Sequence, residues 1–276
     1  MGFYFELLLV IAVFASGFIA LIDRMFFYKA RYARVSTIPG FETLSKHDKR
    51  ELTKGPLFAD YAHSLFPVLL FVFCLRGFVV ELFEVPSGSM LPTIQLGDYF
   101  LVNKFIYGVR IPLFNTELFK VSKPQAGDIM VFQDPVNPQI DLIKTVIGLP
   151  GDHITYINKK LTINGVPVPR KYIGRTIELN NANLGYTAVD HYQETINGHV
   201  HDIYNTPGIA PVDFTNLVVP AGEYFMMGDN RDNSDDSRGW GFAPYKNIEG
   251  KAYMLVFSWN SVTHRVRWDR IGKKMP

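Results

Sequence analysis

The chain has 276 residues, enough for one large domain or two modest ones. Its net charge is only +2 and no basic tract stands out, so the sequence predicts no nucleic-acid partner. Aromatic residues make up 14% of the chain, which argues against a purely soluble protein and is typical of one partly embedded in a membrane.

The first predicted element, over residues 1–22, is a membrane-spanning helix. Residues 3–22 carry one charge, Glu6, and about 20 apolar residues suffice to cross a hydrocarbon layer of roughly 30 Å. A cleavable signal peptide would begin with basic residues and end at a small-residue cleavage site, and the segment shows neither pattern. We therefore expect a retained membrane anchor.

A second membrane-spanning helix is predicted over residues 61–80. Pro67 should kink it, and Arg76 interrupts it near its end, where a long basic side chain can reach the membrane interface. The single cysteine, Cys74, is expected to be a small buried apolar side chain, since one thiol cannot form an intrachain disulfide. A buried helix of a soluble protein is the alternative that this composition leaves open.

The segment between the two spans, residues 23–60, is predicted to be a basic cytoplasmic loop. It contains eight basic residues, and such loops stay on the cytoplasmic side of a membrane. The N-terminus and residues 81–276 are then expected on the opposite side. The sequence thus predicts a multi-pass membrane protein with its large C-terminal domain on the outer side of the membrane.

That exported domain, residues 81–276, is predicted to be mainly antiparallel β. Short runs rich in Val, Ile, Phe and Tyr recur between turn residues. These runs cover residues 99–103, 128–132, 142–147, 153–157, 160–163, 224–227 and 252–259. Asn164-Gly165 predicts a tight hairpin. The polar, less periodic stretch over about 170–214 is expected to be an insertion or a smaller second β-lobe.

The turn Pro86-Ser87-Gly88-Ser89 follows the second apolar segment and contains a candidate nucleophile. Glycine lets a substrate approach the backbone closely, and proline stiffens the loop. Ser89 could therefore be both exposed and held in place. An ordinary Ser-Gly surface loop is the alternative, and the turn alone does not exclude it.

Lys144 lies in the apolar run 142–147, whose residues are apolar on both faces of the predicted strand. Burial on both sides would lower the pKa of the amine, because desolvation disfavours the charged form. A neutral lysine can act as a general base toward a serine hydroxyl. The alternative is a lysine on an edge strand whose charged end reaches water.

Residues 228–238, Gly-Asp-Asn-Arg-Asp-Asn-Ser-Asp-Asp-Ser-Arg, follow a predicted strand as a polar loop. A solvated loop and a calcium-binding loop are the simple interpretations, but the acidic spacing departs from that of an EF-hand. Interleaved Asp and Arg favour a self-contained hydrogen-bond network. Such a network could orient Ser234 toward a neighbouring polar group.

Together these three motifs, in this order and behind two predicted spans, resemble bacterial type I signal peptidase (leader peptidase). The resemblance covers nearly the whole chain. It implies a membrane-bound serine endopeptidase that cleaves N-terminal signal peptides from exported preproteins with a Ser–Lys dyad. It implies preprotein signal peptides and the lipid bilayer as partners, with the secretion translocon as a further candidate. No cofactor and no metal are expected.

The resemblance also implies roles for single residues. Ser89 matches the nucleophile and Lys144 the general base, while the Ser89 N–H and the Ser87 hydroxyl match the oxyanion hole. Ser234 matches a serine that hydrogen-bonds the lysine, and Asp236 and Arg238 match a supporting ion pair. The remaining matched positions are a supporting residue, Asp229, and five residues near the shallow substrate pockets, Phe83, Val85, Pro86, Ile143 and Met226.

One position departs from the family pattern. The family usually has arginine after the catalytic lysine, whereas this chain has Thr145. By strand alternation Thr145 should point away from the active face, so we expect it to have little effect on the chemistry.

Other residues invite a metal site or a membrane contact. Three histidines, His191, His199 and His201, lack the cysteines or carboxylates that would complete a metal site, and solvated loop histidines are expected instead. Trp259 and Trp268 could form a patch at the membrane interface, or they could pack in the core.

Three alternatives to a signal peptidase remain at this point. Another Ser–Lys β-fold protease, such as a self-cleaving repressor, would need a DNA-binding segment rather than two spans. The endoplasmic-reticulum type of signal peptidase would carry histidine in place of Lys144. A catalytically silent membrane-anchored scaffold would have no need of Ser89, Lys144 and Ser234 together.

Overall fold

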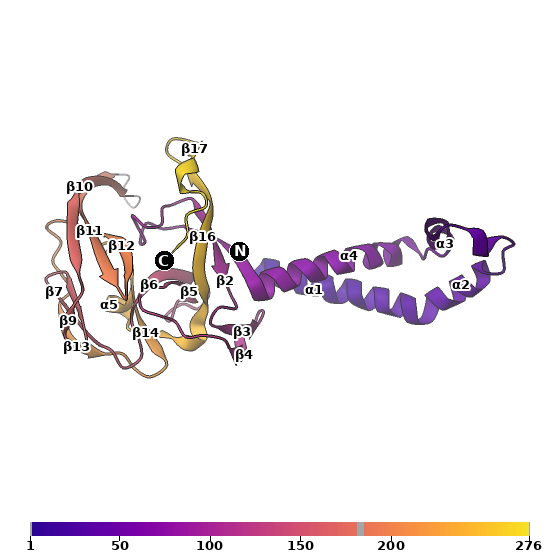
Figure 1. The fold of residues 1–276 in the computed structure, drawn as a ribbon, viewed down its shortest axis with the longest axis horizontal. Coiled ribbons are helices and arrows are strands. Elements are labelled where there is room, and N and C mark those ends of the chain that lie inside the picture. The colour runs from indigo at the N-terminus through magenta and orange to yellow at the C-terminus, as the bar shows by residue number, and fades with distance from the viewer. Residues whose placement is uncertain (1, 181–184, 276) are drawn as a thin grey trace. The chain divides into compact units, whose positions relative to one another are not determined.

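The structure is a computed structural model that describes residues 2–180 and 185–275 (Figure 1). It divides into two compact units, residues 1–79 and residues 80–276. The first unit is helical and the second is mainly antiparallel β-sheet, as the sequence predicts.

Two long apolar helices build the N-terminal unit. Helix α1 (Gly2–Ile22) runs on through a π-helical turn into α2 (Tyr28–Val35), and α4 (Leu57–Cys74) runs on into a second π-helical turn (Leu75–Val79). The resulting helices, Tyr4–Val35 and Leu57–Val79, are long and apolar enough to cross a membrane. In the most apolar 18-residue stretch of each helix, only 17% and 11% is buried, so most of this apolar surface is exposed.

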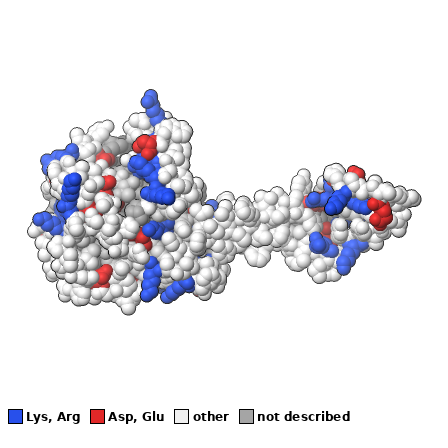
Figure 2. All heavy atoms as spheres, in the orientation of Figure 1, with Lys and Arg blue, Asp and Glu red and all other residues white. Residues whose placement is uncertain are grey.

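Helices α1 and α4 pack closely against each other. A Cβ atom at Gly17 would lie 2.6 Å from the Phe66 ring, so only glycine permits this approach. The charged side chains of this unit gather around α2 and α3 (Lys46–Leu52), which leaves the surfaces of α1 and α4 almost free of charge (Figure 2).

The segment between the two spans differs from the plain loop predicted over residues 23–60. It contains α2, a 3-10 turn (Phe41–Thr43) and α3. Residues 23–35 contain no glycine or proline, so nothing stops the first helix before Pro39-Gly40. Arg31 also binds Asp23 through two hydrogen bonds of 2.7 Å. The second span begins at Leu57, before the predicted residue 61, and Val80 belongs to the first strand.

An eight-stranded antiparallel sheet forms the centre of the C-terminal unit. Its order is β1-β2-β16-β5-β6-β14-β15, and β17 (Arg265–Val266) pairs with β16. The strands are β1 (Val80–Glu84), β2 (Asp98–Asn103), β5 (Ile129–Gln133), β6 (Asp141–Gly148), β14 (Glu223–Met227), β15 (Ala243–Pro244) and β16 (Ile248–Asn260).

Strand β5 is central and buried on both faces, since Ile129, Met130, Val131 and Phe132 are each at most 1% exposed. Ile129 and Val131 belong to one apolar cluster, whereas Met130 and Phe132 belong to another. The sheet is therefore covered on both sides near β5 and its partner β6, and a polar side chain between them lies in an apolar environment.

Smaller sheets complete this unit. One contains β13 (Phe214–Val218), β7 (His153–Ile157), β8 (Lys160–Ile163) and β9 (Val166–Pro167). Another contains β10 (Arg170–Asn180), β11 (Gly185–Ile196) and β12 (His199–Asn205). The remaining elements are the hairpin of β3 (Gly108–Ile111) and β4 (Thr116–Lys120), the short helix α5 (Ser237–Trp240) and two 3-10 turns (Tyr245–Asn247 and Trp268–Arg270).

The hairpin predicted at Asn164-Gly165 is confirmed. It joins β8 to β9, and both residues have positive φ, 52° and 77°, as a type I′ turn requires. The stretch predicted as a second lobe over about 170–214 holds the three-stranded sheet of β10, β11 and β12, although residues 181–184 lie outside the described part.

Candidate active site

The turn that contains Ser89 lies between β1 and β2 and is anchored from inside the protein. Met90 and Ile94 are fully buried next to it, and the Ile94 N–H donates to the Met90 carbonyl oxygen at 2.9 Å. Apolar anchors on one side of Ser89 thus fix its backbone. Ser89 itself is 9% exposed.

Lys144, on β6, reaches this serine from the sheet. Its Nζ atom donates a hydrogen bond of 2.8 Å to Ser89 Oγ, and its side chain is nearly inaccessible to solvent. Burial lowers the pKa of Lys144 to about 8, although the charges of Asp236, Asp235 and Asp229 oppose this change. A neutral amine at this distance can accept the hydroxyl proton of the serine.

Ser87 lies on the open side of the same turn. Its Oγ atom is 3.3 Å from Ser89 Oγ, and the residue is exposed. A hydroxyl beside the nucleophile can donate to an oxyanion that forms there. Its role as an oxyanion donor stays a prediction.

The polar loop after β14 comes next to the lysine because β14 pairs with β6. Met227 is opposite Thr145, so Gly228 begins the loop beside Lys144. Inside the loop Asp236 forms an ion pair of 2.7 Å with Arg238 and accepts the Gly228 N–H at 2.9 Å. The predicted Asp–Arg pairing is present between Asp236 and Arg238, but the network is not self-contained, because Arg231 pairs with Glu194 and Asp232 pairs with Lys159, both outside the loop.

Ser234 does not make the hydrogen bond to Lys144 that the resemblance implies. Its Oγ atom is buried and has no hydrogen-bond partner in the described part of the chain. Ser234 packs against Gly228, where a Cβ atom would lie 2.1 Å from Ser234 Oγ and 2.6 Å from the Ser89 carbonyl oxygen. Gly228 thus lets the loop and the nucleophile turn meet closely.

Asn230 is a site residue that the sequence reasoning missed. Its N–H donates to the Ser89 carbonyl oxygen and its side-chain amide donates to the Gly88 carbonyl oxygen, each at 3.0 Å. Both contacts go to backbone atoms, which carry no sequence pattern, so only its place in the loop could have suggested it.

Thr145 follows Lys144 on β6, so strand alternation places it on the opposite face, and its effect on the chemistry stays a prediction. Its hydroxyl donates to Asp229 Oδ1 at 2.8 Å. Asp229 is fully buried, and its other oxygen lies 2.5 Å from Thr93 Oγ1. Burial raises the pKa of the Asp229 carboxyl group.

The five predicted substrate-pocket residues do not form one surface. Phe83, Val85 and Ile143 belong to one apolar cluster, and Pro86 is exposed at the start of the turn. Met226 is fully buried in the other cluster, so its side chain reaches no open pocket.

The expectation of solvated loop histidines is wrong, because all three lie on strands. His201, on β12, is 4% exposed, and its ring nitrogens form no hydrogen bond with any described residue. His191 Nε2 lies 2.9 Å from an Asp202 oxygen. Within residues 2–180 and 185–275, no group of three or more His, Cys, Asp or Glu side chains could hold a metal ion.

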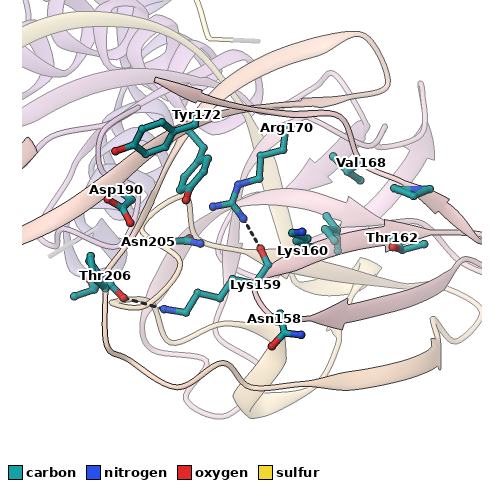
Figure 3. Close-up of a pocket in the computed structure, with 14 residues that line it drawn as sticks. Asn158, Lys159, Lys160, Thr162, Val168, Arg170, Tyr172, Asp190, Asn205 and Thr206 are labelled. Atoms are coloured by element: carbon teal, nitrogen blue, oxygen red, sulfur yellow. Dashed lines mark hydrogen bonds between the residues drawn. The ribbon is translucent and has the colours of Figure 1, made fainter. Parts of the chain in front are cut away.

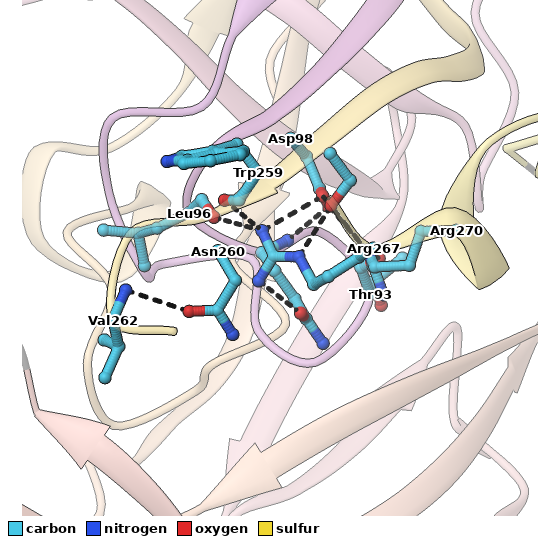
Figure 4. A network of polar contacts seen from close by, with 10 residues as sticks. Thr93, Leu96, Asp98, Trp259, Asn260, Val262, Arg267 and Arg270 are labelled. Carbon is cyan, nitrogen blue, oxygen red and sulfur yellow. Dashed lines mark hydrogen bonds and ion pairs between the residues drawn. The ribbon is translucent and has the colours of Figure 1, made fainter. Parts of the chain in front are cut away.

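A buried polar network supports the nucleophile turn from the C-terminus (Figure 4). Asp98 is fully buried and pairs with Arg270, whose guanidinium also donates to the Thr93 carbonyl oxygen at 3.0 Å. Nearby, Trp259 is partly exposed and Trp268 is 76% exposed, which excludes core packing for Trp268. An interfacial patch at these residues stays a prediction.

A separate cavity of about 640 Å³ lies between β8 and the start of β10 (Figure 3). Neither Ser89 nor Lys144 lines it. Lys159 on its wall donates to Asp232 at 2.8 Å, so this cavity adjoins the polar loop of the candidate active site.

Comparisons with known proteins identify the family of this chain. The family model described as signal peptidase, peptidase S26, matches residues 58–258. A signal peptidase I of Pseudomonas fluorescens is 41% identical, with 99% of each chain covered. A signal peptidase I of Pseudomonas aeruginosa is 42% identical, covering 97% of this chain and 98% of the relative.

A crystal structure of a signal peptidase I from Enterococcus faecalis is 32% identical, covering 47% of this chain and 97% of that chain, with a TM-score of 0.32. The assignment rests on the family model and on the full-length relatives. This chain belongs to the signal peptidase family, peptidase S26, and is a serine peptidase.

Proposed function

We propose that the chain is a membrane-bound endopeptidase that cleaves N-terminal signal peptides from exported preproteins with a Ser89–Lys144 dyad. The observation that supports this most strongly is the 2.8 Å hydrogen bond between the buried Lys144 Nζ and Ser89 Oγ. Membership of the signal peptidase family supports the substrate class.

The reaction begins with proton transfer from Ser89 to neutral Lys144, and Ser89 Oγ attacks the scissile carbonyl carbon. The Ser87 hydroxyl and the Ser89 N–H stabilise the oxyanion, and loss of one such donor typically costs about 10²–10³ in kcat. Lys144 then returns its proton to the departing amine. Water, deprotonated by Lys144, then attacks the acyl carbon. The ester bond to Ser89 breaks, and Lys144 returns the proton to Ser89 Oγ.

The substrate segment would bind in an extended conformation along a strand edge. Strand β1 is at one end of the main sheet and leads directly to the Ser89 turn. A strand with a free edge can pair with an extended peptide through main-chain hydrogen bonds. Addition to this edge would bring a scissile bond toward Ser89.

Two apolar helices support attachment to the membrane, and the eight basic residues over 23–60 support a cytoplasmic position for the segment between them. The C-terminal unit would then lie on the periplasmic or outer face of the inner (plasma) membrane. Its partners there would be preproteins and the lipid bilayer, with the secretion translocon as a further candidate.

The test uses the full chain in detergent and a preprotein substrate. We expect Ser89→Ala to abolish cleavage and Ser87→Ala to lower kcat by about 10²–10³, as one oxyanion donor predicts. Thr215→Val, at an exposed position of β13, serves as the control. Circular dichroism checks folding, and near-normal cleavage by folded Ser89→Ala would exclude this function.

A further inference from the structure

The Asp229 carboxyl group lies between the two segments that hold the dyad. On one side it contacts Thr145, the residue after Lys144 on β6. On the other side it contacts Thr93, which follows Ser89 by four residues. One buried side chain thus joins the strand of the base to the turn of the nucleophile.

The hydrogen bonds of the Thr93 hydroxyl group indicate whether the Asp229 carboxyl group is protonated. Thr93 Oγ1 lies 2.5 Å from Asp229 Oδ2 and 3.2 Å from the Asp202 carbonyl oxygen. A hydroxyl group has one proton, and an ionised carboxylate and a carbonyl oxygen can only accept. With an ionised Asp229, one of these two contacts would therefore lack a proton.

A proton on Asp229 Oδ2 resolves this conflict. Asp229 then donates to Thr93, and Thr93 donates to the Asp202 carbonyl oxygen. The Thr145 hydroxyl donates to Asp229 Oδ1, so both Asp229 oxygens and the Thr93 hydroxyl have a partner. Buried polar atoms in native proteins are nearly always satisfied in this way.

The surroundings of Asp229 favour the neutral form. Asp229 is fully buried and forms no ion pair with another described residue, and burial raises the pKa of its carboxyl group. His201 on β12, Arg231 in the loop and Lys144 on β6 are the charged or titratable groups that act on it. Arg231 is paired with Glu194, so its charge is largely compensated.

We propose that Thr145 and Thr93 are positioning residues that act through a protonated Asp229, which holds the strand of Lys144 and the turn of Ser89 at a fixed separation. The inference rests on the proposed function, because the dyad must work for its alignment to matter. Asp229 also precedes Asn230, whose two hydrogen bonds hold the Gly88 and Ser89 carbonyl groups. A shift of Asp229 would therefore move the nucleophile.

The first test removes the Thr145 hydroxyl donor and keeps the shape of the side chain. Thr145→Val should lower kcat for preprotein cleavage about tenfold, the effect of one lost buried hydrogen bond, and leave KM nearly unchanged. Thr145→Ser should restore most of this loss, because it returns the hydroxyl group. Thr215→Val is the matched control on exposed β13. A wild-type kcat for Thr145→Val, or a serine variant as impaired as the valine variant, would overturn the proposal.

The second test addresses the proton on Asp229. Asparagine resembles a protonated aspartate, since it can donate to Thr93 and accept from Thr145, whereas leucine can do neither. Asp229→Asn should therefore cost at most about tenfold in kcat, and Asp229→Leu at least another tenfold. Equal impairment of the two variants would contradict a neutral Asp229.

An infrared measurement keeps this inference separate from the proposed function. The wild-type protein at pH 7 should show the band of a protonated carboxyl group that is missing in Asp229→Asn, whether or not it cleaves a preprotein. Absence of that band overturns the proposal. Absence of preprotein cleavage by the wild-type protein, with the band present, overturns only the proposed function.

Discussion

Lys144 is only 3% exposed, on a strand whose residues Ile143 and Val146 belong to the two apolar clusters of the main sheet. The proposed dyad would depend on this burial, because Lys144 is hydrogen-bonded to Ser89 and only the neutral amine can accept the serine proton. The apolar residues on both faces of the run 142–147 indicate from the sequence alone that Lys144 is buried. The cost of burying a lysine should therefore be measurable as lost stability.

Replacement of Lys144 by methionine should stabilise the C-terminal unit at neutral pH. Burial lowers the pKa of Lys144 from 10.5 to about 8, and this difference corresponds to about 3 kcal/mol. Below pH 8 Lys144 is protonated in both the folded and the unfolded wild-type protein, and the full free-energy cost of burying its charge is present. As pH rises from 8 to 10.5, the Lys144 amine loses its proton in the folded protein before it does in the unfolded protein. The free-energy cost of burying its charge then disappears.

Thermal unfolding of wild type and Lys144→Met in the same detergent tests this prediction. The Tm of the variant should be higher at pH 6 to 7, and the difference should shrink above pH 8. A lower Tm for the variant at pH 7 would show that the hydrogen bond to Ser89 outweighs the burial of the charge.

Other residues show the limits of sequence reasoning at this scale. Ser234 was matched to the lysine by motif, but its Oγ atom packs against Gly228 without a hydrogen-bond partner among the described residues. Asn230 was missed because it binds backbone atoms. Such contacts depend on how two distant loops meet, and no local pattern encodes that meeting.

Among the elements, the loop over residues 228–238 brings the site together. It follows β14, which pairs with β6, and it touches the nucleophile turn through Gly228 and Asn230. The pairing of β14 with β6 is a long-range contact that the sequence did not predict. The strands themselves were predictable, because their apolar runs end at clear turn residues.

Gly228→Ala should disrupt the close packing of the loop over residues 228–238 against the turn that contains Ser89. The added methyl group would lie 2.1 Å from Ser234 Oγ and 2.6 Å from the Ser89 carbonyl oxygen, so the loop or the turn must move. A displacement of about 1 Å at a catalytic group can cost about 10²-fold in rate, and the overpacking should cost about 1–3 kcal/mol in stability.

Steady-state cleavage and thermal unfolding measure these two effects. Gly174→Ala is the matched control, because a Cβ atom at Gly174 meets no atom within 4 Å. If Gly228→Ala cleaves a preprotein as fast as Gly174→Ala, the close contact between loop and turn has no catalytic importance.

At the scale of the whole molecule, the chain combines a helical unit with a β unit that holds every candidate catalytic residue. The two spans could be predicted from hydropathy alone. The helices α2 and α3 between them could not, because they are only 8 and 7 residues long and give too short a pattern to recognise. The arrangement of strands into several sheets also requires pairings that no single segment specifies.

The orientation of the molecule can be tested with a protease added to the outside of intact spheroplasts. We expect digestion of residues 81–276 and protection of the basic segment over 23–60, as its positive charge predicts. Protection of the C-terminal unit, with digestion only after the membrane is permeabilised, would contradict the proposed topology.

The central claim is that a neutral, buried Lys144 activates Ser89 for cleavage of a preprotein. The pH dependence of kcat/KM tests it most directly, because a general base works only in its unprotonated form. Burial lowers the pKa of Lys144 to about 8, so kcat/KM should rise with pH through about 8 and then level off, and Lys144→Ala should be inactive throughout. A rate that does not change between pH 7 and 9, or a folded Lys144→Ala that retains activity, would contradict the account.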